Sequence, residues 1–394
     1  MVNIIFFLVA FCAKEVSINK DFVAPIRTRE FNINVGFNAP FFSQYINNAE
    51  YKKRYKMQLD SLKAGGIKWI RPNSAFNWDN INPQEGVFDT RVMDSIVKWT
   101  GERGLHIIPF IMYTPEWAVD TVYNFLDAKQ KGEYFRRLLP AKMEYWRDFW
   151  QFVVERYDGD GYKDFCELKI PIKHYEVWNE PRAKKYFLGS FEDYCNLYIE
   201  AQKGALRADT ECIVIGPVIE GGNRSTGWAF YKSNKRKIRY SFKKPFINIH
   251  RTANWIDYIF YFLSYVKEKT GKYPPIISAH LYYADETNNP FGRMDTLLFS
   301  HIDSLFYYFE QNDIDETDVW ITEIGRKIVE PEGEEEKRLE FTEYIISELQ
   351  DSPYSDRIKM FFFAGFTKTY SYLKKKNFSP TPAFKYIREK ITSE

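Results

Sequence analysis

The chain has 394 residues, 45% of them hydrophobic and 18% aromatic, which is enough for one large domain with a sizeable core. Its formal net charge of +2 gives no global field that would draw the protein to nucleic acid or to a membrane surface. The cysteines (Cys12, Cys166, Cys195 and Cys212) are scattered without a CxxC pair, which excludes a disulfide framework and a cysteine zinc site.

The N-terminal segment has the character of a secretion signal. Residues 4–11 are continuously apolar, too few to span a bilayer, and resemble an h-region, while Ala10-Phe11-Cys12 fits a small-x-small cleavage site. We therefore expect residues 1–22 to be a leader and the protein to be exported to the periplasm, the cell surface or the medium. The alternative is a short buried N-terminal strand. No other segment is apolar enough for stable membrane insertion.

Short runs rich in β-branched and aromatic residues alternate with amphipathic stretches along the rest of the chain. The runs predict strands at 33–38, 68–73, 105–112, 174–180, 212–218, 276–283, 319–325 and 359–366. The amphipathic stretches predict helices at 51–64, 91–103, 141–157, 191–207, 255–269, 295–311, from 334 onward, and at 383–390. The first helix should stop at Gly65-Gly66, because glycine is a favoured C-terminal cap.

Strands that alternate with helices of this length predict a parallel sheet built from βαβ units. Eight such units favour a closed barrel over an open sheet, so we expect residues 23–394 to form a single α/β domain, a (β/α)8 TIM barrel. Extra chain at about 113–140 and 219–254 follows the third and fifth strands. Both insertions should lie at the carboxyl face, where barrels of this kind bind their substrates.

Two carboxylates stand at the ends of the fourth and seventh predicted strands. The fourth strand reads His174-Tyr175-Glu176-Val177-Trp178-Asn179-Glu180 before Pro181, and the seventh reads Val319-Trp320-Ile321-Thr322-Glu323. The tops of these strands should face each other across the mouth of the barrel. Cleavage of a glycosidic bond needs such a pair, with one carboxyl group protonated and the other ionised. Glu176 lies deeper, and we interpret it as a buried structural carboxylate that needs a cationic partner such as Arg71.

The motif Trp178-Asn179-Glu180-Pro181, together with Thr322-Glu323, resembles clan A of the glycoside hydrolases, the "4/7" barrel superfamily. Within that clan the chain is most similar to families 39 and 5, and the resemblance extends over nearly the whole chain after residue 30. It implies that Glu180 is the general acid/base and Glu323 the nucleophile. It also implies that Asn179 binds the 2-hydroxyl of the sugar.

Further matches to the same clan extend the predicted site. Arg71 ends the second strand, where related enzymes place an arginine beside the nucleophile, and such a cation keeps a carboxylate ionised. His280-Leu281-Tyr282 resembles the His-x-Tyr pair that flanks the nucleophile. Tyr113-Thr114-Pro115-Glu116-Trp117-Ala118 resembles a family 39 pattern, and we interpret Trp117 as a sugar platform or as packing at the rim.

We therefore predict a retaining glycosidase that acts by double displacement on an oligo- or polysaccharide, with a β-linked glycan as the substrate usual for the clan. The alternatives are a transglycosylase that uses the same intermediate and a barrel that binds carbohydrate without cutting it. The histidines show no metal-ligand spacing, and there is no HExxH motif or phosphate-binding glycine loop, so we expect no metal and no cofactor. The sequence makes no prediction of oligomeric state.

Overall fold

The computed structural model describes residues 33–120, 134–221, 255–284, 297–327, 333–364, 372–374 and 377–392. The predicted leader, and most of the chain in the two insertions, lie outside these residues. Within them the strands are β1 Asn34–Asn38, β2 Trp69–Arg71, β3 His106–Ile107, β4 Phe110–Ile111, β5 His174–Val177, β6 Ile213–Ile215, β7 Val218–Gly221, β8 Ile276–Ala284, β9 Asp318–Lys327 and β10 Ile358–Phe363. The helices that follow them are α1 Ala49–Ala64, α2 Trp78–Ile81, α3 Arg91–Gly101, α5 Met143–Glu155, α6 Phe191–Ala208, α9 Trp255–Thr270, α10 Leu297–Gln311, α11 Glu334–Asp351 and α12 Pro382–Thr392.

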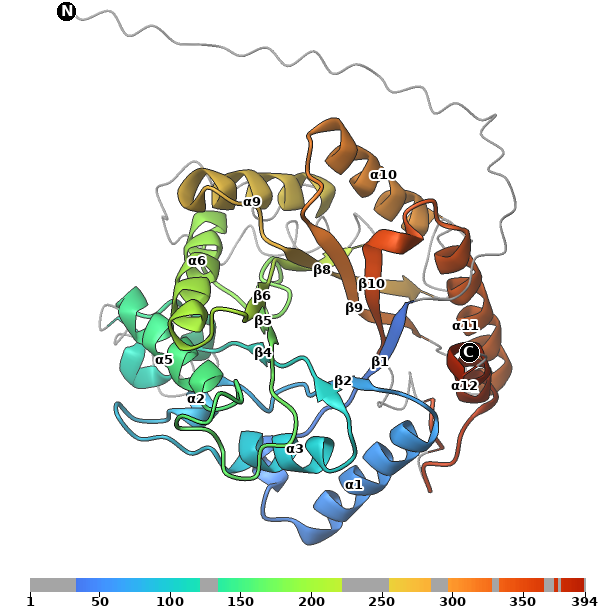
Figure 1. The fold of residues 1–394 in the computed structure, drawn as a ribbon, viewed down its shortest axis with the longest axis horizontal. Coiled ribbons are helices and arrows are strands. Elements are labelled where there is room, and N and C mark those ends of the chain that lie inside the picture. The colour runs from blue at the N-terminus through green and yellow to red at the C-terminus, as the bar shows by residue number, and fades with distance from the viewer. Residues whose placement is uncertain are drawn as a thin grey trace, which may run out of the picture.

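The strands pair in parallel and close into a ring that the helices surround (Figure 1). One sheet has the order β3-β2-β1-β10-β9-β8-β7 and the other the order β4-β5-β6. β3 and β4 are two parts of the predicted third strand, and β6 continues into β7 in the same way along the fifth. The two sheets therefore join at both edges, and the predicted TIM barrel is confirmed.

Proline explains why these two strands are each divided into two. Pro109 and Pro217 lack the backbone N–H that a continuous ladder needs. The ladder nevertheless continues through neighbouring groups. Pro109 O accepts from Glu176 N at 2.9 Å, while Pro217 O accepts from Ser278 N at 3.1 Å and Gly216 N donates to Ile276 O at 3.2 Å. The breaks change the assignment of the strands but leave the barrel closed.

Side-chain caps mark the starts of α1 and α6. The Ser190 hydroxyl accepts a hydrogen bond from Asp193 N, and the Asp193 carboxylate accepts one from Ser190 N, so a capping box starts α6. Asn48 caps α1 by accepting from Tyr51 N. The predicted stop of α1 at Gly65-Gly66 is confirmed, since Gly66 has φ +79°, a conformation that residues with a Cβ seldom adopt.

The interior of the barrel is apolar at its lower level and polar above it. Ile108, Ile215, Ile276, Met360 and Phe362 form a cluster inside the ring together with Trp320, and Trp69 packs against it. Because side chains alternate along a strand, residues two positions further on also point inward. His174 contacts Trp69 and Trp320 inside the ring. Arg71 lies two positions after Trp69, and Glu176 two positions after His174. The alternation therefore places both charged groups directly above this apolar cluster.

Candidate active site

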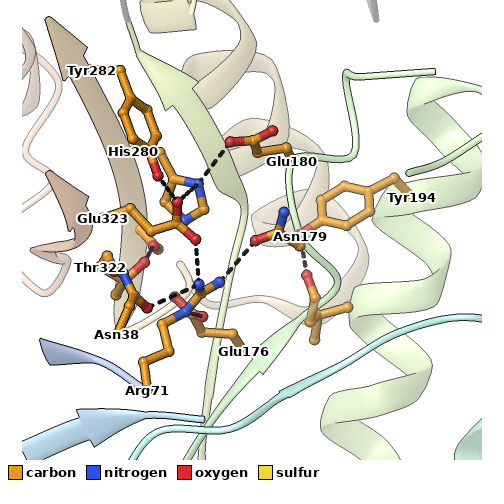
Figure 2. Close-up of polar contacts among 12 residues, drawn as sticks. Asn38, Arg71, Glu176, Asn179, Glu180, Tyr194, His280, Tyr282, Thr322 and Glu323 are labelled. Carbon is orange, nitrogen blue, oxygen red and sulfur yellow. Dashed lines mark hydrogen bonds and ion pairs between the residues drawn. The ribbon is translucent and has the colours of Figure 1, made fainter. Parts of the chain in front are cut away.

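The guanidinium of Arg71 is the centre of a buried polar cluster at the carboxyl ends of the strands (Figure 2). Its Nε donates to Glu176 at 2.5 Å, its Nη1 to Glu323 at 2.5 Å and its Nη2 to Asn179 Oδ1 at 2.9 Å. The planar guanidinium suits this task, because its donors point in fixed and separate directions. One cation thus links strands β2, β5 and β9, and the predicted pairing of Arg71 with Glu176 is confirmed.

Asn38, at the end of β1, completes the same cluster and was missed by the sequence reasoning. Its Oδ1 accepts from Arg71 Nη1 at 3.4 Å, and its Nδ2 donates to Thr322 O at 3.2 Å, next to Glu323. The rule that singled out Arg71, a polar residue at the carboxyl end of a barrel strand, applies equally to Asn38. It holds both the arginine and the backbone beside Glu323 in place.

Glu323 is only 8% exposed and has donors on both oxygens. Arg71 binds Oε1, the hydroxyl of Tyr282 donates to Oε2, and His280 Nδ1 lies 3.7 Å from Oε2. Burial raises the pKa of Glu323, but the charges of His280 and Arg71 and the hydrogen bond from Tyr282 outweigh it, so the pKa lies below its ordinary value. The surroundings of Glu323 therefore favour the ionised carboxylate.

Glu180 faces Glu323 from the opposite side, with His280 between them (Figure 2). His280 Nδ1 is 3.1 Å from Glu180 Oε1, and the exposed Lys185 places its Nζ 3.9 Å from Glu180 Oε2. Burial lowers the pKa of His280, but the charge of Glu323 and the hydrogen bond with Glu180 together outweigh burial. The pKa of His280 therefore lies above its ordinary value.

The fourth strand ends earlier than predicted, and this alters how Glu180 is presented. β5 stops at Val177, and Trp178 and Glu180 have φ values of +66° and +43°. The prediction of extended backbone up to Glu180 is therefore wrong, because a turn that aims both Asn179 and Glu180 at the barrel mouth needs left-handed backbone there. Trp178 Nε1 anchors this turn by donating to Tyr186 O at 3.0 Å, and Tyr194 anchors the strand end by donating to Val177 O at 2.9 Å.

One oxygen of Glu180, one oxygen of Glu323 and one nitrogen of His280 lie within 4.8 Å of one another. Direct attack on an anomeric carbon requires carboxyl groups about 5–5.5 Å apart, whereas attack through a water needs about 6.5–9.5 Å. The close approach of one oxygen from each carboxyl group is compatible with the first geometry. The same three groups are also potential metal ligands, although Arg71 already supplies a positive charge to Glu323.

Of the predicted site residues, Glu180, Glu323, Asn179, Arg71, His280 and Tyr282 meet in this cluster, whereas no contact links Trp117 to it. Trp117 lies in the turn Glu116–Ala118, where its indole N–H donates to Asn82 O at 2.8 Å. Its ring packs edge-on against Trp78 and Tyr145, with centroids 6.1 and 5.2 Å away. Lys185 joins the site from the loop after Glu180, and no sequence signal distinguished it from other surface lysines.

No protein-family profile matches the sequence, and no curated protein is significantly similar to it. Among the described residues, no helix has the length and apolarity to cross a membrane.

Three solved structures that share the fold are named as a glucosidase, a β-xylosidase and a xylanase. A glucosidase from Croceicoccus marinus matches with a TM-score of 0.57 and 15% identity over 84% of this chain and 63% of its own length, so this chain spans less than two thirds of it. A GH39 β-xylosidase from Caulobacter crescentus matches with a TM-score of 0.57 and 14% identity, over 91% of this chain and 72% of the xylosidase. Xylanase 10B from Thermotoga maritima matches with a TM-score of 0.55 and 15% identity, over 92% of this chain and 96% of the xylanase. The chain therefore shares the barrel fold of these enzymes, and the predicted resemblance to glycoside hydrolase family 39 is confirmed at the level of the fold.

Proposed function

We propose that this protein is a retaining glycoside hydrolase that cleaves a β-linked glycan by double displacement. The observation that carries the proposal is the pair Glu180 and Glu323, which come from opposite strands and have carboxyl oxygens within 4.8 Å of each other. The sequence motifs support it, and the solved structures that share the fold are named as glucosidase, β-xylosidase and xylanase. The β linkage and the retention of configuration are part of the proposal.

In the first step Glu323 attacks the anomeric carbon while Glu180 gives a proton to the leaving oxygen. The bond from the anomeric carbon to that oxygen breaks, and a glycosyl ester forms on Glu323. In the second step Glu180 removes a proton from water, which attacks the same carbon and releases Glu323. The two inversions together leave the configuration unchanged.

The surroundings of the two carboxylates support the two proposed roles. Glu323 is held by Arg71 and Tyr282, which stabilise its negative charge and fix its orientation. Among the described residues, no guanidinium forms an ion pair with Glu180, and its nearest charged or titratable neighbours are His280 and Lys185. Asn179 is fixed through its Oδ1 by Arg71, which leaves its amide N–H groups to donate to a sugar hydroxyl.

The test is sugar release from a panel of aryl β-glycosides and of plant and microbial polysaccharides. Wild type runs beside Glu323→Gln, with Glu316→Gln on an exposed loop as the matched control. We expect release by wild type and by the control only, with the β-anomer as the first product seen by NMR. Equal release by all three proteins would show that Glu323 is not the nucleophile. An α-anomer as first product would exclude retention.

Product analysis at high acceptor concentration separates hydrolysis from transglycosylation. Binding of a glycan without any release would favour the non-catalytic alternative.

Export is a separate proposal that rests on the apolar run at residues 4–11. It is tested by fractionating cells that express the full chain with and without residues 1–22.

A further inference from the structure

The loop between α5 and β5 carries a group of carboxylates that the proposed chemistry does not use. It reads Asp158-Gly159-Asp160-Gly161-Tyr162-Lys163-Asp164. Asp158, Asp160, Gly161 and Asp164 have the spacing of the third, fifth, sixth and ninth positions of a calcium-binding loop, in which the glycine makes the sharp turn. Gly161 has φ +94°, as such a turn demands.

The three aspartates converge, although like charges repel each other. One oxygen from each lies within 4.8 Å of the others. Backbone N–H groups hold them there: Asp160 N donates to Asp158 Oδ1 at 3.2 Å, Tyr162 N donates to Asp160 Oδ1 at 2.7 Å, and Gly159 N and Gly161 N donate to the two oxygens of Asp164 at 3.0 and 2.7 Å. A carboxylate oxygen that accepts one such bond has a lone pair left for a cation.

A second observation, independent of the loop's own hydrogen bonds, indicates a missing partner. Asp158 is only 3% exposed, and its Oδ2 is buried with no hydrogen-bond partner within the described chain. Just before the loop, Glu155 Oε1 is likewise buried without a partner. A buried carboxylate oxygen without a donor is costly to maintain, and in proteins such groups are paired or bind a metal.

We propose that Asp158, Asp160 and Asp164 bind a calcium ion. Carboxylate and carbonyl oxygens are the ligands that hard cations prefer, and Ca²⁺ accepts the irregular geometry of a loop more readily than Mg²⁺ does. The remaining ligands would be water and backbone carbonyl oxygens of the loop. The ion would offset the repulsion among the three carboxylates and satisfy Asp158 Oδ2.

The ion's role would be structural, because the loop is attached to the start of the strand that leads to Glu180. Ile172 N donates to Tyr157 O at 2.8 Å, which closes the loop just before β5 begins at His174. A Cβ on Gly159 would meet Pro171 at 2.5 Å, so the loop packs directly against this connection. The site lies at the amino end of β5 and Glu180 lies beyond its carboxyl end, so the inference is independent of the proposed glycosidase.

The experiment is a thermal melt of the full chain, stripped with EDTA and then titrated with CaCl2 or MgCl2 at constant ionic strength. Loops of extracellular calcium modules bind in the range of about 10⁻⁴–10⁻³ M, so the titration extends to about 5 mM. We expect Ca²⁺ to raise the Tm of wild type by about 3 °C and Mg²⁺ to have a much smaller effect. Terbium luminescence sensitised by the adjacent Tyr162 gives a direct measure of binding.

Asp158→Asn and Asp160→Asn should each abolish the shift, while the exposed Asp315→Asn, on the loop before β9, should keep it. Asp160 is exposed, so its variant keeps the test valid if Asp158→Asn fails to fold. Wild type without a calcium shift would overturn the proposal. A shift that persists in both loop variants would overturn it too, because the ion would then bind elsewhere. An equal response to Mg²⁺ would overturn the assignment to calcium.

Discussion

The two halves of the barrel present their carboxylates in different ways. Glu323 belongs to β9, a strand of 10 residues that pairs with the 9 residues of β8 through one register shift, between Ala279 and His280. His280 and Tyr282 project from β8. Glu180 follows β5, a strand of 4 residues, on a turn with left-handed backbone. In the proposed mechanism the nucleophile thus sits on paired strands among fixed donors, whereas the proposed acid/base sits on a turn.

The largest expected effect comes from removing the carboxylate on β9. Glu323→Gln keeps the size of the side chain but removes the nucleophile, so kcat/KM on a responsive aryl glycoside should fall by about 10⁵-fold. Far-ultraviolet circular dichroism checks that the variant is folded. A loss of less than tenfold in a folded variant would give the nucleophile's role to another residue.

Glu180→Gln tests whether the carboxylate on the turn protonates the leaving group. Loss of the general acid should lower kcat/KM by about 10²–10⁴-fold for poor leaving groups such as alkyl alcohols. For dinitrophenolate, which leaves without a proton, the first step should change little. The measurement is a plot of log kcat/KM against the pKa of the leaving group. The same slope for wild type and variant would contradict the acid role.

Arg71→Lys tests whether the positions of Glu323 and Asn179 depend on the one guanidinium that contacts both. Lysine keeps the charge but cannot reach Glu176, Asn179 and Glu323 together, so the nucleophile and the sugar-binding amide should both lose their alignment. We expect a fall of about 10²-fold in kcat/KM and a loss of about 2–3 kcal/mol in the free energy of unfolding. Kinetics and urea titration measure the two. Arg91→Lys, an exposed arginine at the start of α3, is the matched control.

The smallest effect is expected for Tyr282→Phe, which removes one donor from Glu323. The hydrogen bond from Tyr282 lowers the pKa of Glu323, so the variant should have a higher pKa there and about tenfold lower kcat. Activity needs ionised Glu323 and is lost as pH falls through its pKa. The acidic limb of the kcat/KM profile should therefore move to higher pH. An unmoved limb, or one displaced to lower pH, would contradict the role of Tyr282.

The same pKa has a consequence for stability. Because the folded pKa of Glu323 lies below the unfolded one, ionised Glu323 contributes stability at every pH above its unfolded value, about 4.3. That contribution is lost as pH falls through the folded pKa. Tyr282→Phe narrows the gap between the two values, so the variant should lose less stability than wild type on acidification below about pH 4.

The sequence by itself determined the barrel and most of the site. Alternating apolar runs and capped amphipathic helices located the strands to within a few residues, because side-chain periodicity and capping are local properties of the chain. The position of each polar residue near the predicted carboxyl end of a strand was enough to bring Glu180, Glu323, Arg71, His280 and Tyr282 to one face, since all parallel strands of a barrel end there.

Only the tertiary structure decided how these groups share their partners. Arg71 contacts Glu176, Asn179 and Glu323, which are 105, 108 and 252 positions further along the chain. It also binds Asn38, which no motif had singled out. The turn at Trp178 and the contact of His280 with both carboxylates were equally hidden. A strand's periodicity states which way a side chain points, but distances across the mouth depend on the closure and register of the whole barrel.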